Sequence, residues 1–140
     1  MKRAALTIAI ALVIVALFFF VPVLRDEPWT RLRIAGVIIA LIGLAFVVTA
    51  HINLGDSFTF TPQAKGPLVT HGLYSKIRNP MYVFVDLTVA GLILAVNLPW
   101  LLVLIPIWAI FQARQAGREA RVLQEKFGQA YLDYRKKTWF

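Results

Sequence analysis

Long apolar stretches separated by short polar segments dominate this chain of 140 residues. Two of these stretches, Ala4–Leu24 and Ile34–Leu54, are almost free of charge. A bilayer core of ~30 Å requires about 20 predominantly apolar residues for a helix to cross it, and both stretches satisfy this length. We therefore predict transmembrane helices over residues 4–24 and 34–54. The first is expected to stay uncleaved, because it is too long for a signal peptide and no A-x-A-like site follows it.

A third apolar region, residues 81–111, contains a polar, proline-containing turn signal at residues 97–100. We predict two short helices here, residues 81–97 and 99–113, which form a hairpin through or nearly through the bilayer. Pro106 is expected to kink the second arm, because a proline inside a helix removes a backbone hydrogen bond.

The complete prediction is one all-α integral membrane domain with four transmembrane helices. The remaining segments are a loop over residues 55–80 and an amphipathic helical tail over residues 114–140, in which Gly128 is expected to break or bend the helix. The composition agrees with a membrane location, since 59% hydrophobic residues is too high for a soluble domain of this size. The simplest interpretation of the tail is a basic helix lying on lipid head groups.

The distribution of lysine and arginine predicts the orientation. The N-terminus, the loop and the tail together hold all but three of the 15 Lys and Arg residues, the exceptions being Arg25, Arg31 and Arg33. Because cytoplasmic segments carry an excess of these residues, both termini are predicted to be cytoplasmic. The net charge of +8 is explained by contact with anionic membrane lipids and requires no nucleic acid. The chain contains no cysteine, which excludes disulfides and thiolate metal sites.

The loop over residues 55–80 is long for a membrane protein of this size, and loops longer than ~12–15 residues are usually functional or disordered. Its prolines and glycines supply turns and free backbone amides, which can bond a polar ligand where protein surrounds them. We expect the loop and the tail to fold over one another and to enclose a pocket at the inner leaflet.

Two segments carry a family resemblance. The segment LVTHGLYSKIRNPMY, Leu68 to Tyr82, resembles the pattern L-V-T-x-G-x-Y-x-x-x-R-H-P-x-Y of the isoprenylcysteine carboxyl methyltransferase family and its bacterial relatives. The segment EARVLQEKFGQAYLDYRKK, Glu119 to Lys137, resembles the C-terminal block of that family, and LGDSF, Leu54 to Phe58, matches a weaker element. The two main motifs occur in the family's order, separated by a hairpin of the expected length.

The resemblance implies an integral membrane methyltransferase, in the inner membrane of a bacterium or an archaeon, that uses S-adenosylmethionine on a lipophilic acceptor. A soluble methyltransferase would instead need a strand, a Gly-rich turn and a β/α pattern, which this sequence lacks. Three positions are expected to be catalytic, namely Arg78, Asn79 and Glu119. The implied cofactor contacts are Leu68, Val69, Gly72, Tyr74, Arg78, Asn79, Pro80, Tyr82 and Glu119. No metal is implied.

The chemistry of these residues fits such roles. Glu119 can pair with the ammonium of the cofactor, and Arg78 can hold a carboxylate by a bidentate contact. Gly72 can let the backbone approach a ligand closely, and Pro80 suits the first turn of the third helix. The ordinary structural explanations are that Arg78 is a membrane anchor, that the tyrosines belong to the interfacial belt, and that Glu119 offsets a neighbouring arginine.

Two positions depart from the family pattern. Residue 79 is Asn where the family most often has His, so no side chain there titrates near neutral pH, and residue 120 is Ala where a second Glu is common. A carboxylate or thiol acceptor is favoured, because an amine acceptor must lose a proton and no base is obvious. The alternatives are a phospholipid N-methyltransferase and a catalytically weakened cofactor-binding or structural membrane subunit.

Asp86 is an ionisable residue inside the third predicted helix. Such a group is costly in a membrane and is a functional candidate by default, with Tyr82 or Arg78 as its expected partner. A hydrated position near the cytoplasmic surface is the alternative. His51 and His71 are expected to be interfacial and not to form a metal site.

Overall fold

The computed structural model describes residues 28–55 and 66–139. These residues form helices connected by short irregular segments, and their β pairing is a single isolated bridge between Ile77 and Trp139. The elements in chain order are α2 (Arg31–Leu54), the 3₁₀ helix η2 (Gly72–Ser75), α3 (Pro80–Ala95), the 3₁₀ helix η3 (Pro99–Val103), α4 (Leu104–Phe127) and α5 (Gln129–Lys137). The predicted helix over residues 4–24 lies outside the described residues.

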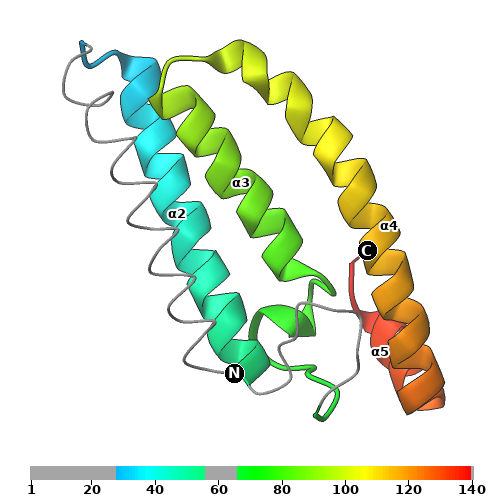
Figure 1. The fold of residues 1–140 in the computed structure, drawn as a ribbon. Helices are drawn as coiled ribbons and strands as arrows, with labels where there is room; N and C mark the ends of the chain where they lie inside the picture. The colour runs from blue at the N-terminus through cyan, green and yellow to red at the C-terminus, as the bar shows by residue number, and fades with distance from the viewer. Residues whose placement is uncertain (1–27, 56–65, 140) are drawn as a thin grey trace.

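Figure 1 shows how these helices are arranged. Helices α2 and α3 lie side by side and antiparallel, and the chain turns at η3 so that α4 runs back past α3 toward the η2 end of the molecule. Helix α5 then folds back beside the end of α4. This arrangement places the segment before α3, the end of α4 and α5 in one region.

Two described segments are long and apolar enough to cross a membrane, Arg31–Leu54 and Pro99–Phe127, while Pro80–Ala95 is apolar but shorter. Large apolar side chains on α2 and α4 are exposed, for example Leu41 at 61% and Trp108 at 58%, as expected for surfaces that contact lipid. The prediction of an all-α membrane protein is confirmed in this coarse form. The number of four transmembrane helices stays a prediction.

Helix α4 differs from the expected division into a span and a separate tail. The expected boundary at residues 113 and 114 falls inside one continuous helix that ends at Phe127. Polarity changes along α4, but no proline follows Pro106 and the residues around the boundary are good helix formers, so nothing stops the helix there. Gly128, with φ of 52°, ends α4 as predicted.

The two prolines expected to shape α3 and α4 both lie in a first helical turn. Pro80 is the first residue of α3, as predicted. Pro106 is the third residue of α4, where the backbone N–H has no partner within the helix, so its absence costs little and gives no reason for a kink.

Small residues make the contact between α2 and α3 close. Gly36, Gly43 and Gly91 are buried, and a Cβ atom added at any of them would lie less than 3.0 Å from the backbone of the other helix. The rings of Phe46 and Phe84 stack with centroids 4.6 Å apart farther along the same contact. Small side chains let membrane helices approach and gain dispersion energy, so this pair is the scaffold of the described fold.

The end of this helix pair farthest from η2 is held by Arg33, which is 1% exposed. Its Nε donates a hydrogen bond of 2.9 Å to the carbonyl oxygen of Ala95, and its guanidinium lies 5.4 Å from the ring centre of Trp29. A cation at the C-terminal carbonyls of α3 interacts favourably with the helix dipole.

Candidate functional site

The first motif folds as a short turn against α2. Gly72 has φ of 58°, and the backbone N–H of Leu73 donates a hydrogen bond of 3.0 Å to Oδ1 of Asn53. A Cβ atom at Gly72 would collide with the Asn53 side chain. The structure therefore explains why residue 72 is a glycine: it packs closely against α2 and has a left-handed backbone. The sequence had indicated only a close approach to a ligand.

The start of α3 leaves a polar side chain outside the helix. Asn79 occupies the N-cap position, but its side chain forms no capping hydrogen bond. Its carbonyl oxygen accepts hydrogen bonds from the backbone N–H groups of Tyr82 and Val83, at 3.2 and 3.4 Å. The half-buried Asn79 amide is therefore not used to start α3, although asparagine is a favoured capping residue.

A short hydrogen bond joins the two sequence motifs. The hydroxyl of Tyr82 on α3 donates to Oε1 of Glu119 on α4 at 2.6 Å, and Nε2 of Gln115 lies 3.4 Å from the same oxygen. Glu119 is half-buried, and its bonds to described residues go to these neutral groups rather than to Arg118 or Arg121. The structure therefore does not support the explanation that Glu119 offsets the charge of a neighbouring arginine.

Two further tyrosines lie beside this bond. The hydroxyl of the buried Tyr134 on α5 donates a hydrogen bond of 2.8 Å to the carbonyl oxygen of Tyr74 in η2. Burial, and then the neighbouring Tyr131, raise the pKa of Tyr134 to about 12, against the opposing influence of Arg78. Burial, Tyr134 and Glu119 together raise the pKa of Tyr74 above its usual value. Both hydroxyls are therefore protonated at neutral pH.

These contacts define a polar cluster, named here the tyrosine–glutamate cluster, which consists of Tyr74, Arg78, Tyr82, Glu119 and Tyr134. Its members come from η2, the segment between η2 and α3, the start of α3, α4 and α5. The loop and the tail therefore meet, as expected from the sequence. Arg78 is half-buried beside Tyr134, and Glu119 is close enough to affect Tyr74 electrostatically.

The remaining sequence-predicted residues lie near members of this cluster in the sequence. Pro80 is almost fully buried at the start of α3, while Leu68 and Val69 are half-buried in the irregular segment before η2. None of the hydrogen bonds described for the cluster in residues 28–55 and 66–139 involves Leu68 or Val69. A depression of about 270 Å³ on α4 is lined by Arg121, Gln124 and Glu125, which are not among the predicted residues. The pocket enclosed by loop and tail stays a prediction.

The prediction that Asp86 pairs with Tyr82 or Arg78 was wrong. Oδ1 of Asp86 accepts a hydrogen bond of 2.7 Å from Nε2 of Gln112 on α4, not from Tyr82 or Arg78. The Tyr82 hydroxyl is already bonded to Glu119, so the next turn of α3 meets a different residue of α4. Gln112 is the buried residue of α4. The sequence signal that could have identified it is a lone amide at the end of an apolar run.

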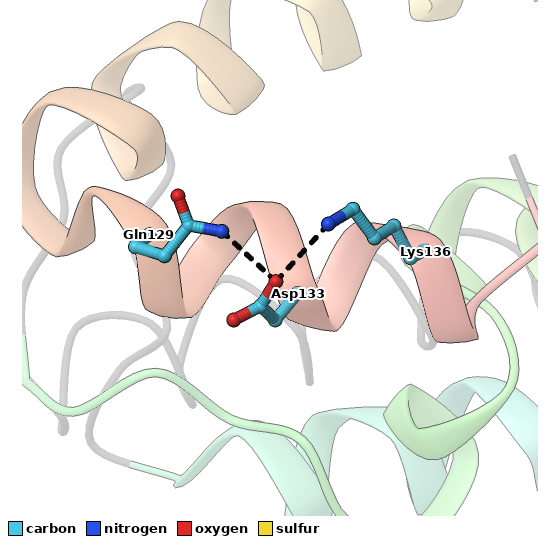
Figure 2. A network of polar contacts seen from close by, with 3 residues as sticks. All are labelled: Gln129, Asp133 and Lys136. Carbon is cyan, nitrogen blue, oxygen red and sulfur yellow. Dashed lines mark hydrogen bonds and ion pairs between the residues drawn. The ribbon is translucent and has the colours of Figure 1, made fainter.

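Sequence reasoning also missed how the tail attaches. The backbone N–H of Trp139 donates to the carbonyl oxygen of Lys76 at 2.7 Å, and the N–H of Arg78 donates to the carbonyl oxygen of Trp139 at 3.5 Å. The face of α5 that carries Asp133 is solvated. Figure 2 shows Asp133 on this face, where its carboxylate accepts hydrogen bonds from Gln129 at 3.0 Å and Lys136 at 3.3 Å. These bonds lower the pKa of the Asp133 carboxyl.

Comparison with known proteins identifies the family. The family model described as phospholipid methyltransferase matches residues 31–130. The chain belongs to the phospholipid methyltransferase family. This member also resembles the solved structure of a eukaryotic intramembrane Ras methyltransferase, isoprenylcysteine carboxyl methyltransferase, with 26% sequence identity and a TM-score of 0.69. That match covers 98% of this chain but 50% of the other, so the chain spans about half the length of that enzyme. Among curated proteins, none matches significantly.

Membership of the phospholipid methyltransferase family confirms the resemblance found in the sequence. The chain is thus a member of a family of membrane methyltransferases, and it shares the fold of the solved enzyme over its own length. The family match ends at residue 130, so it includes Tyr82 and Glu119 but not Tyr134 or Trp139.

Proposed function

We propose that this chain transfers a methyl group from S-adenosylmethionine to a lipophilic acceptor at the membrane surface. The observation that carries the proposal is the 2.6 Å hydrogen bond between Tyr82 and Glu119. It joins two motifs that lie 37 residues apart in the chain, and both motifs resemble those of membrane methyltransferases.

The residues present fit the charges of S-adenosylmethionine. Its ammonium needs an anion, and Glu119 has neutral partners among the described residues, so its negative charge is not already offset there by a protein cation. Its carboxylate needs a donor, and the Arg78 guanidinium can supply a bidentate contact. The aromatic faces of Tyr74 and Tyr82 suit a purine or a sulfonium. When bound, this cofactor supplies a methyl group on a good leaving group.

The chain's own residues then have to bind, orient and exclude water. Tyr82 holds the Glu119 carboxylate in one orientation, and Asn79 offers an amide that does not cap α3. In this proposal Arg78, Asn79 and Glu119 contact the reacting molecules. The other proposed cofactor contacts are Leu68, Val69, Gly72, Tyr74, Pro80 and Tyr82.

The proposed topology has four transmembrane helices with both termini in the cytoplasm. It is supported by the distribution of basic residues and by the exposed apolar side chains of α2 and α4. The tyrosine–glutamate cluster would then lie at the inner leaflet, with its acceptor drawn from the lipid phase. The basic helix α5 lies beside the cluster, which agrees with an interfacial position.

The proposed acceptor is a carboxylate, as in an isoprenylcysteine-like molecule, or a thiol, because either arrives as its own nucleophile. A phospholipid amine is the second candidate, and Asp86 is the observation in its favour. The Asp86 carboxylate is hydrogen-bonded to the neutral Gln112 of α4, and Tyr82 on the same helix α3 also bonds to α4. This carboxylate could accept the proton that an amine must lose.

Purified protein in detergent or lipid, given methyl-labelled S-adenosylmethionine and an acceptor panel, tests the proposal. Transfer to a prenylcysteine or a thiol supports the first acceptor class, and transfer to phosphatidylethanolamine supports the second. Binding without transfer to any acceptor would indicate a weakened member, a possibility that Asn79 and Ala120 raise. Absence of cofactor binding by titration calorimetry, in protein that is folded, contradicts the proposal.

A further inference from the structure

The tyrosines of the second motif are not used in the proposed cofactor contacts, yet they are the buried residues of α5. Tyr131 is 2% exposed and Tyr134 is 9% exposed, with ring centres 6.2 Å apart. Both are buried, whereas the side chain of Asp133 on the same helix is 53% exposed. Their burial shows that α5 packs on the structure through these rings.

Tyr134 contacts the first motif through one directed bond. Its hydroxyl donates to the carbonyl oxygen of Tyr74, which is 60 residues away in sequence and belongs to the short turn η2. A buried carbonyl that loses its donor is left unsatisfied, which is unfavourable, so this bond contributes to holding η2 in place.

The backbone of Trp139 adds two bonds to the same segment. Its N–H and its carbonyl oxygen pair with Lys76 and Arg78, on either side of Ile77. The Trp139 side chain is 73% exposed, so the backbone rather than the indole makes the attachment. Thr138 is already extended, with φ of −113° and ψ of 151°, which directs the chain along the 76–78 segment.

The segment from Tyr74 to Arg78 is therefore held on both sides. On one side Asn53 bonds the neighbouring Leu73 to α2. On the other side the segment is bonded by Tyr134 of α5 and by Trp139, which follows α5. A 3₁₀ turn of 4 residues has few hydrogen bonds of its own. The orientation of the residues that follow, Arg78 and Asn79, thus depends on these outer contacts.

We propose that the Tyr134 hydroxyl and the Trp139 backbone form a clasp that positions Arg78 for cofactor binding. The inference rests on the proposed function in one respect, namely that Arg78 holds the carboxylate of S-adenosylmethionine. Tyr134 and Trp139 are positioning residues in this scheme and do not contact the cofactor themselves.

The test uses two substitutions at one residue. Trp139→Pro removes the N–H that bonds Lys76, and the extended Thr138 is the conformation that a following proline requires. Trp139→Ala keeps the backbone and is the matched control. We expect Trp139→Pro to weaken cofactor binding about fivefold, the equivalent of one hydrogen bond, and Trp139→Ala by less than twofold. Equal effects of the two would overturn the clasp.

Tyr134→Phe removes only a hydroxyl and provides a second variant in case the proline prevents folding. It too is expected to weaken binding about fivefold. Each clasp variant is then combined with Arg78→Gln. If the clasp acts through Arg78, its loss has no further effect in the Arg78→Gln background. A general structural defect would instead weaken binding by the same factor in both backgrounds and would contradict the proposal.

A measurement without cofactor separates this inference from the proposed function. Hydrogen–deuterium exchange of the amides of residues 74–79 should become faster in Trp139→Pro and Tyr134→Phe but not in Trp139→Ala. Unchanged exchange in both would refute the clasp even if methyl transfer is observed. Failure of the wild-type protein to bind S-adenosylmethionine, with the exchange pattern as expected, would refute the proposed function and leave the clasp as a property of the fold.

Discussion

Helix α3 contacts its two neighbours in opposite ways. Toward α2 it presents Gly91 and Ala95, and the two backbones approach so closely that an added methyl group does not fit at Gly91. Toward α4 it presents polar side chains, and the described bonds run from Tyr82 to Glu119 and between Asp86 and Gln112. One contact depends on shape and the other on directed hydrogen bonds.

The difference explains where the candidate site lies. A contact between small side chains leaves no functional group free, and it tolerates no ligand between the helices. A contact made by carboxylates, amides and hydroxyls keeps groups that a polar ligand can also use. The contact of α2 with α3 thus provides a scaffold, and the contact of α3 with α4 provides the chemistry.

The largest effect is expected from breaking the contact between α2 and α3. Gly91→Leu would force side-chain atoms into the backbone of Ala40, and overpacking of this kind costs about 1–3 kcal/mol or more. We expect loss of folded protein in size-exclusion chromatography. The control is Gly117→Ala on α4, where no described residue lies within 4 Å of an added Cβ atom and the stability should be unchanged or slightly higher. Equal amounts of folded protein for the two variants would contradict the close packing of α2 against α3.

Glu119→Gln should separate binding from folding. The amide oxygen can still accept from Tyr82, so we expect little change in thermal stability, but the charge for the ammonium is lost. Charged hydrogen bonds are worth about 1.5–3 kcal/mol, which corresponds to a roughly 10- to 100-fold weaker affinity for S-adenosylmethionine. Glu125→Gln, on the exposed face of the same helix, is the control. An unaltered affinity by calorimetry would remove Glu119 from the site.

Substitutions at Asp86 and Gln112 measure how much the polar contact between α3 and α4 contributes to stability. Asp86→Leu and Gln112→Leu should each destabilise the protein, and the double variant should be more stable than the sum of the two predicts. Hydrogen bonds between membrane helices average about 0.6 kcal/mol, with values up to ~1.7, and the coupling should fall in this range. A double-mutant cycle of unfolding in detergent measures it. Strict additivity would show that the bond does not hold α4.

The last effect appears only at alkaline pH. The pKa of Tyr134 is raised to about 12 in the folded protein, so between about pH 10 and 12 the unfolded state loses a proton that the folded state keeps. Stability should therefore decline as the pH rises through this interval, and less so in Tyr134→Phe. Absorbance of tyrosinate and the unfolding midpoint, followed together, check this. A decline of the same size in Tyr134→Phe would exclude Tyr134 as a source.

Much of the local structure could be predicted from the sequence. The apolar run 34–54 lies within α2, Pro80 begins α3 and Gly128 ends α4, because hydropathy, proline and glycine act on the chain within a few residues. The meeting of the two motifs could also be anticipated, since both carry polar groups that a membrane protein has to place together. The continuity of α4 could not be predicted, because a change in polarity along the chain does not show whether the helix ends there.

The sequence by itself determined the class of this protein, an all-helical membrane protein that belongs to a methyltransferase family, because apolar runs and motif spacing can be recognised without any knowledge of packing. Only the tertiary structure decided which polar groups meet: Asp86 with Gln112, Tyr134 with Tyr74, and Trp139 with Lys76. Each pairing depends on the rotation of one helix against another. A rotation of one residue, about 100°, moves a side chain to another face, and the linear pattern does not specify it.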